Sequence, residues 1–328
     1  MKRFIAIFSL LAASGIALAQ VGGVGGTQGG EGGPRPQTPS QDKSMNRVSN
    51  DSSLNNKNTA DQSQQPTAPS TGKHQPVAKT QDEFKAYQDA AAKPDAPSAE
   101  AAADEFTQKY PQSELRGALY QRVMSLYQNA NNADKTIEMG HKTLAIEPDN
   151  APAMVTIATF LANRTRDTDL DRDERFAEAK KDAEKAIELA NAGEAVPAGT
   201  PAAAAGQYKD TLVSMAYAAL GAVEFNNKNY PAAEQNLRKS VEPSQAQPDP
   251  ISWYQLGLTL QRESKYPDSL NAFQKCLDLA ANSPEVTSAC KRQQDYVTRL
   301  ANNPPPKPAA PAAAPATAPA PTTTPQSK

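Results

Sequence analysis

The sequence predicts an all-α fold, a solenoid of antiparallel helical hairpins with a C-terminal capping helix, flanked by disordered arms. Three observations predict it: a repeat in the second half, helix-start signals ahead of apolar helical patterns, and the segregation of Gly and Pro to the chain ends. Of the 17 Gly in 328 residues, eight fall between positions 22 and 33, and nine of the 28 Pro fall between 304 and 325. Such segments bury too little apolar surface to offset their ordering entropy. The folded part is therefore predicted to span residues 80–302.

The first 19 residues have the pattern of a secretory signal peptide. Lys2 and Arg3 precede an uncharged apolar run over residues 4–17, and small residues end at Ala19. The run is shorter than the ~20 residues that a spanning helix needs, so we expect cleavage before Gln20 rather than a retained anchor. No later stretch is apolar enough to span a membrane. The product is expected to be exported, periplasmic or secreted, with an association with the cell envelope left open.

The segments on either side of the predicted domain are expected to be disordered. Residues 20–79 form a Gly/Ser/Asn/Gln-rich linker, and residues 303–328 form a Pro/Ala-rich tail that would act as a semi-rigid spacer. The formal net charge is −2. A balance this close to neutral excludes a dominant nucleic-acid or polybasic membrane-binding role, because phosphate binding needs a concentrated cationic face.

Two segments in the second half of the chain align at an offset of 36 residues. An aromatic residue is followed three and four residues later by Leu and Gly, which places the three on one helix face, where Gly lets a neighbouring helix approach closely. A Tyr-Pro pair then starts a second helix, with Pro tolerated in its first turn. Each segment is predicted to be one helical hairpin. The matched positions are Tyr217, Leu220, Gly221, Tyr230, Pro231, Ala233 and Leu237 with Trp253, Leu256, Gly257, Tyr266, Pro267, Ser269 and Phe273.

This pattern resembles the tetratricopeptide repeat, and the match is best from Trp253 to Leu279. The resemblance extends upstream, where 147–150 fits the turn between repeats. It reaches a degenerate first hairpin that opens with a capping box from Thr80 to Glu83. The Tyr-Pro-x-Ser sequence at 110–113 is similar to the hairpin ending found in tetratricopeptide proteins of the bacterial cell envelope. The resemblance implies hairpins at about 80–110, 114–148, 151–190, 208–242 and 250–281, and a cap at 284–300 after Ser283.

The insertion at 191–207 departs from the family pattern and is expected to interrupt or hinge the solenoid. It contains Gly, Ala and Pro between the third and fourth hairpins. Asn129, Asn163 and Asn226 recur near the ends of the first helices. Two interpretations stay open for these asparagines: they bond the backbone of a ligand, or they accept the left-handed conformation that often ends a helix.

Cys276 and Cys290 form a candidate disulfide. An exported protein meets an oxidising compartment, where an even number of cysteines favours a bridge. The spacing of fourteen positions matches no metal-binding pattern. Two buried thiols acting as small hydrophobic residues are the alternative, and the sequence does not decide between them.

Catalytic and metal-binding patterns are nearly absent. His141 is the single histidine of the predicted domain, and no nucleophile motif surrounds it. Alternating carboxylates after residue 166 follow the order of a calcium loop, but Arg172 stands where the tight turn demands Gly, and neighbouring arginines can neutralise the acids. We therefore expect no catalytic residue, no cofactor and no metal. A calcium site stays open as the alternative, and its candidate ligands are Asp167, Asp169, Asp171, Asp173 and Glu178.

The resemblance implies a binding groove built from first-helix positions. This set is neutral to apolar, which predicts a peptide or partner helix held by apolar and amide contacts. Phe225, Tyr254 and Leu258 are the expected anchors, although packing between repeats is an alternative for Phe225 and Leu258. The predicted groove residues are Gln121, Ser125, Val155, Thr159, Ala218, Ala222, Phe225, Tyr254, Leu258 and Arg262.

The sequence therefore favours a non-catalytic scaffold of the periplasm or cell envelope that binds a protein or peptide partner. The alternative is a carbohydrate- or peptidoglycan-binding envelope module that uses Trp253 and Tyr254 as a stacking platform. A hydrolase with an unrecognised site is the third hypothesis, and the scarcity of His and Cys argues against it.

Overall fold

The computed structural model describes residues 75–242 and 249–303. The predicted signal peptide at 1–19, the predicted linker up to residue 74 and the predicted tail from residue 304 lie outside the described residues.

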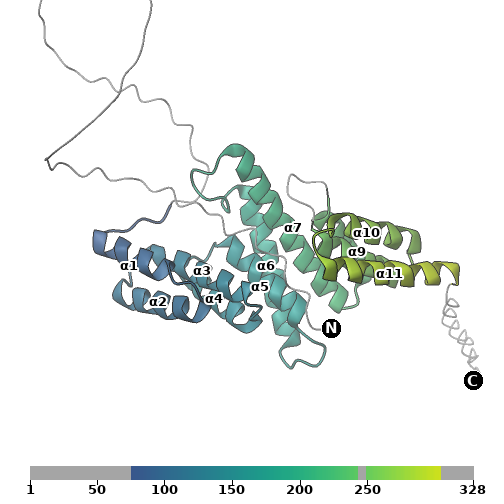
Figure 1. The fold of residues 1–328 in the computed structure, drawn as a ribbon, viewed down its shortest axis with the longest axis horizontal. Helices are drawn as coiled ribbons and strands as arrows, with labels where there is room; N and C mark the ends of the chain where they lie inside the picture. Colours follow the sequence, from purple (N-terminus) through teal and green to yellow (C-terminus); the bar gives the residue numbers. More distant parts are fainter. Residues whose placement is uncertain (1–74, 243–248, 304–328) are drawn as a thin grey trace, which may run out of the picture. The chain divides into compact units, whose positions relative to one another are not determined.

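The described chain is all-α, as predicted, and its helices pack in sequence as hairpins (Figure 1). The hairpins are α1 with α2, α3 with α4, α5 with α6, α7 with α8, and α9 with α10, and α11 packs on the last pair. The helices in the described ranges are α1 (Gln81–Ala91), α2 (Ala96–Lys109), α3 (Leu115–Asn129), α4 (Ala133–Ile146), α5 (Ala151–Arg164), α6 (Arg172–Ala192), α7 (Ala202–Asn226), α8 (Tyr230–Ser240), α9 (Pro250–Arg262), α10 (Tyr266–Leu279) and α11 (Pro284–Asn302).

Side-chain caps start several of these helices. The Thr80 half of the predicted capping box is confirmed at α1, where the Thr80 hydroxyl accepts a hydrogen bond from the Glu83 N–H at 3.1 Å; the Glu83 carboxylate in turn accepts from the N–H of Lys79 at 2.7 Å. An Asn or Asp side chain accepts from the first turn of α2, α4, α5 and α9 in the same way, which satisfies N–H groups that have no partner inside the helix. Ser283 precedes α11 as predicted, but its side chain makes no capping bond.

Three hairpin turns share one backbone geometry. Asn131, Lys228 and Ser264 have φ of 57°, 61° and 61°, the left-handed conformation. In each turn the following residue donates its N–H five positions back, at 2.9 Å in all three, as in a Schellman helix ending. The left-handed residue lies two positions beyond Asn129 and Asn226, which are both helical, so the left-handed interpretation was wrong for these two asparagines. Lys228 and Ser264 are separated by the same 36 residues as the sequence repeat.

Glycine permits close packing inside the fourth and fifth hairpins, as the repeat predicted. A Cβ atom on Gly221 would lie 2.5 Å from Cγ of Leu237, and one on Gly257 would lie 2.7 Å from Cε1 of Phe273. Leu237 and Phe273 are both fully buried. Because real Cβ atoms do not approach other atoms this closely, the first helix of each pair can carry no side chain at this position without displacing its partner.

A polar network joins α2, α3 and α4 in the N-terminal hairpins. The Tyr127 hydroxyl donates to the Glu100 carboxylate at 2.5 Å, and Lys135 pairs with the same carboxylate at 2.8 Å. One turn later on α2, Asp104 accepts from the Tyr120 hydroxyl at 2.7 Å and pairs with Lys142 at 3.0 Å. Burial opposes ionisation of Glu100, but the bonds from Lys135 and Tyr127 hold its pKa below the ordinary value. The network fixes the register of the two hairpins over the buried cluster of Phe106, Leu119 and Val123.

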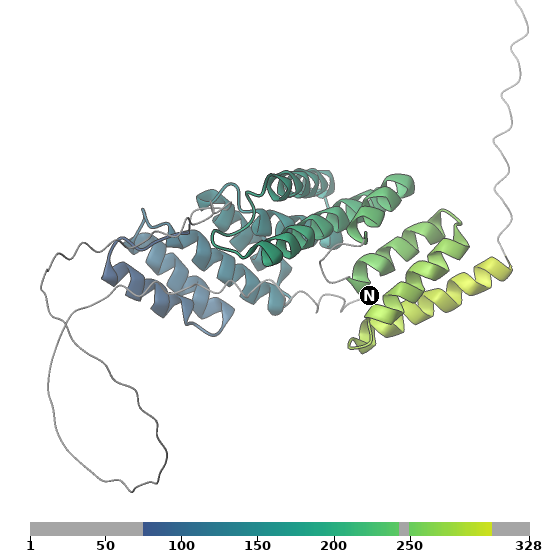
Figure 2. The same cartoon turned by 90° about the horizontal axis from the view of Figure 1, so that it is seen from above.

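The insertion between the third and fourth hairpins does not interrupt the packing. After Gly193, which ends α6 with φ of 78°, the chain forms a short loop in which Ala195 and Val196 are buried. Helix α7 begins at Ala202, inside the expected loop, because the run of Ala there has high helix propensity. The lengthened α7 packs against both α5 and α6 (Figures 1 and 2). The expectation of an interruption at this insertion is therefore wrong.

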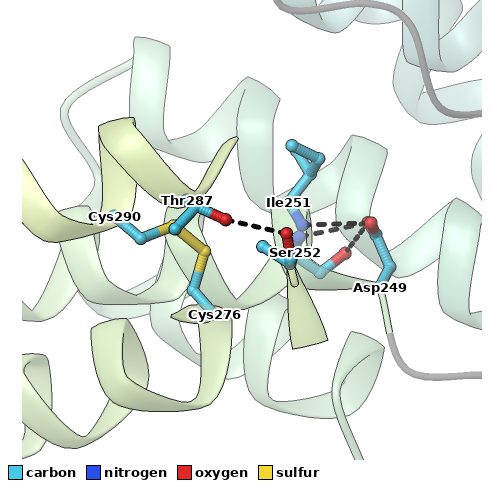
Figure 3. Close-up of a disulfide and its surroundings, with 7 residues drawn as sticks. Asp249, Ile251, Ser252, Cys276, Thr287 and Cys290 are labelled. Atoms are coloured by element: carbon cyan, nitrogen blue, oxygen red, sulfur yellow. Dashed lines mark hydrogen bonds between the residues drawn. A yellow bond between two sulfur atoms is a disulfide. The ribbon is translucent and has the colours of Figure 1, made fainter. Parts of the chain in front are cut away.

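A disulfide joins Cys276 of α10 to Cys290 of α11, with Cα atoms 6.2 Å apart (Figure 3). Both cysteines are fully buried, in a cluster with Ala280 and Val286. The Thr287 hydroxyl adds a 2.7 Å hydrogen bond to the carbonyl of Ala280. Helix α11 is thus held to the last hairpin by a covalent bond, apolar packing and a side-chain hydrogen bond.

Replacing Gly257 with Ala is expected to destabilise the protein by about 1–3 kcal/mol, because the new methyl group must displace the buried ring of Phe273. Urea unfolding followed by circular dichroism measures the change. Asn271→Ala on the exposed side of α10 is the control and is expected to stay within about 0.5 kcal/mol of wild type. Equal stability of Gly257→Ala and wild type would show that the helices have room to move apart.

Reduction of the Cys276–Cys290 bond is expected to lower stability by about 3 kcal/mol, the typical effect of closing a loop of this length. Thermal melts with and without a reductant able to reach buried disulfides measure the loss. The Cys276→Ala/Cys290→Ala variant is the control, since its melting temperature should not respond to reductant. Identical melts of fully reduced and oxidised wild type would contradict the role given to the bond.

Candidate partner-binding surface

The predicted groove residues lie on the first helices of the second to fifth hairpins, α3, α5, α7 and α9. Positions four apart on a helix share a face, so each helix contributes one short row. Val155 and Ala222 are 0% and 6% exposed; they pack between helices and were wrongly included among residues that touch a partner. Arg262 is exposed. The half-buried members of the set are Gln121, Ser125, Thr159, Ala218, Phe225, Tyr254 and Leu258.

Amide side chains connect these rows. The Gln121 side-chain oxygen accepts from the Asn150 amide at 3.1 Å. On α9 the Gln255 amide donates to the side-chain oxygen of Asn163 at 3.1 Å, which ties the end of α5 to α9. Gln255 was not predicted, although it directly follows Tyr254. No sequence signal identifies it, because its role depends on how close α9 lies to α5.

The two aromatic anchors pack within their own hairpins. The Phe225 ring meets Tyr230 edge-on at 5.6 Å between centroids, and the Tyr254 ring meets Phe273 at 5.8 Å. Both rings remain half-buried. Burial raises the pKa of the Tyr254 hydroxyl above its ordinary value. The rings are therefore held in fixed orientations, and the part of each that stays accessible is preorganised for contact.

Trp253 is a packing residue. Its half-buried side chain lies against both C-terminal clusters, one containing Leu237 and Leu256 and the other containing Cys276 and Cys290. A ring held between two clusters presents little flat surface for stacking on a sugar.

Arg172 occupies the centre of the loop whose order follows a calcium site. Its guanidinium lies 3.3 Å from the Asp167 carboxylate and 2.8 Å from the Asp173 carboxylate. It also donates to the Asn226 carbonyl at 3.2 Å and to the Asn227 side chain at 2.7 Å. These bonds attach the loop to the turn between α7 and α8.

The other carboxylates of this segment are also engaged. A side-chain bond from Arg175 lowers the pKa of Asp171. In the described ranges, no group of three His, Cys, Asp or Glu side chains is placed to hold a metal ion. The remaining pairs are Asp171 with Arg175 at 2.6 Å, Asp169 with the backbone N–H of Arg166 at 2.9 Å, and Glu178 with His141 at 2.6 Å.

No helix of the described part of the chain is both long and apolar enough to cross a membrane. His141, the single histidine in that part, lies on α4 with its ring bonded to Glu178 of α6. Among the described residues no serine, threonine or cysteine is bonded to this imidazole.

Comparison with known proteins assigns no family to this chain. No protein-family model matches the chain, and no curated protein sequence matches it. The crystal structure of BtubC (BKLC) from P. vanneervenii aligns with 67% of this chain and 79% of its own, at 16% identity and a TM-score of 0.34. The all-helical hairpin fold of the present chain rests on its own helices and turns.

Calcium is expected to leave the protein unchanged. The carboxylates around Arg172 are neutralised by arginine or bonded to the backbone, so a cation would have to break those contacts. Thermal melts and tryptophan emission recorded with calcium and with magnesium at equal ionic strength test this. A rise in melting temperature specific to calcium would contradict it.

Proposed function

We propose that the protein is a non-catalytic scaffold that binds a protein partner along the first helices of its hairpins. The observation that carries the proposal is the row of half-buried, uncharged side chains on α3, α5, α7 and α9, among them Ser125, Phe225 and Leu258. Such a surface suits a peptide or partner helix held by apolar and amide contacts. Tandem helical hairpins favour this use, because they offer an extended surface to one partner.

The cellular setting of the proposal comes from the sequence. The apolar run and small residues before position 20 favour export, and the segment lies outside the described residues. We propose that the mature protein works in the periplasm or cell envelope, where an oxidised Cys276–Cys290 bond would persist.

A carbohydrate-binding module has less support. It needs an exposed aromatic platform, whereas Trp253 is shared by two buried clusters and Tyr254 packs on Phe273. Titration with envelope oligosaccharides distinguishes the two functions, because stacking on Trp253 would quench its fluorescence and the scaffold function predicts no change.

Capture of partners from an envelope extract tests the scaffold function. A Ser125→Arg/Leu258→Arg variant places two charges on the first-helix rows. It is expected to lose most of the bound partner, because each arginine would lie against an uncharged part of the partner without a counter-charge. The control is Asn271→Arg on the exposed side of α10, which should retain the partner. Both variants must first show wild-type circular dichroism.

The measurement is the amount of each captured partner relative to the amount captured by the wild-type protein. Partners retained equally by the Ser125→Arg/Leu258→Arg variant and by the control would contradict binding along the first helices.

A further inference from the structure

One contact joins the second helices of two successive hairpins through a titratable pair. Nε2 of His141 on α4 lies 2.6 Å from Oε1 of Glu178 on α6. The two side chains are 50% and 37% exposed, so solvent protons reach them freely. Histidine is the side chain that ordinarily changes charge between about pH 5 and 8, and its protonated form makes the stronger, charge-assisted hydrogen bond to a carboxylate.

A second acid lies one helical turn further along α6. Asp182 is only 8% exposed, and its Oδ2 atom is buried without a hydrogen-bond partner among the described residues. An ionised carboxylate in such a place is costly. Burial, together with the negative charge of Glu178, raises the pKa of Asp182 to about 6, against the opposing effects of Lys181 and His141.

The helices packed against α6 add few charges here. Helix α5 carries one charged residue, Arg164 at its C-terminal end, which donates to the Asn131 side chain. Helix α7 carries Lys209, Asp210 and Glu224, and Glu224 is paired with Lys180. The groups that govern Asp182 are therefore Glu178 and Lys181 on its own helix and His141 on α4.

We propose that His141, Glu178 and Asp182 form a pH-sensitive junction between the second and third hairpins. The junction is more stable when it is protonated and less stable when it has lost its protons. Below about pH 6 the Asp182 carboxyl is neutral beside the His141–Glu178 contact. Above that pH the Asp182 and Glu178 carboxylates, four residues apart on α6, repel each other. This proposal is independent of the partner-binding function.

The shifted pKa of Asp182 determines whether stability rises or falls with pH, because folding and proton binding are linked. The pKa of Asp182 is higher in the folded protein than its ordinary value of 3.8, so the folded state holds this proton more tightly. The stabilisation is complete below the ordinary pKa and is lost as pH rises through about 6.

Hydrogen exchange measured by mass spectrometry at several pH values between about 5 and 8 tests the junction. After correction for intrinsic exchange, protection of α4 and α6 in the wild type is expected to fall about tenfold over this range, relative to α9. Asp182→Asn keeps the shape without the charge, so it should match wild type in acid and retain more protection in alkali. Adding Glu178→Gln should change the profile no further, because the Asp182 charge that Glu178 repels is already absent.

Glu184→Gln is the matched control, because Glu184 is an exposed acid on the same helix; it should keep the wild-type profile. If Asp182→Asn fails to fold, Glu178→Gln alone still decides, since removal of the neighbouring negative charge lowers the pKa of Asp182 and must reduce the slope. Protection of α4 and α6 that is constant across the range in wild type, or a wild-type slope in the double variant, would overturn the proposal.

Discussion

The contact on which the structure depends is the close approach of the two helices within a hairpin. Gly221 faces Leu237 and Gly257 faces Phe273, each at a distance that leaves no room for a Cβ atom. The absence of a side chain on the first helix lets a large residue of the second helix become fully buried. Each hairpin still presents apolar surface on its outer sides, so it must be covered by the next hairpin, and the array ends where α11 covers the last one.

Polar contacts then set how successive hairpins meet. Lys135 and Lys142 of α4 reach the carboxylates of α2, and Lys265 at the start of α10 reaches Glu234 of α8 at 2.5 Å. Bonds of this kind contribute little each when exposed. Their main contribution is to specify the packing of the hairpins, because they form in only one register of the helices. The long α7 packs against both α5 and α6 and carries the array past the insertion.

Much of the fold was predictable, because it depends on spacing. The 36-residue offset placed Gly257 on the first helix and Phe273 on the second helix of one hairpin, and the cap at Thr80 marked the start of α1; that the two residues face each other is seen only in the structure. The start of α7 and the left-handed residues at Lys228 and Ser264 were not predictable, since Lys and Ser rarely adopt this conformation and only the turn imposes it. The surface was predictable only in part: helix position placed Leu258 and Ser125 on first helices, but burial of Val155 depends on the neighbouring helices.

A double-mutant cycle between Gly257→Ala and Phe273→Leu tests the central role of the close helix contact most directly. If the added methyl group acts by displacing the buried ring, Gly257→Ala should cost less when the smaller Leu is present, with a coupling energy of about 1 kcal/mol or more. Strictly additive changes in the free energy of unfolding would contradict the account, because the glycine would then act through backbone entropy alone.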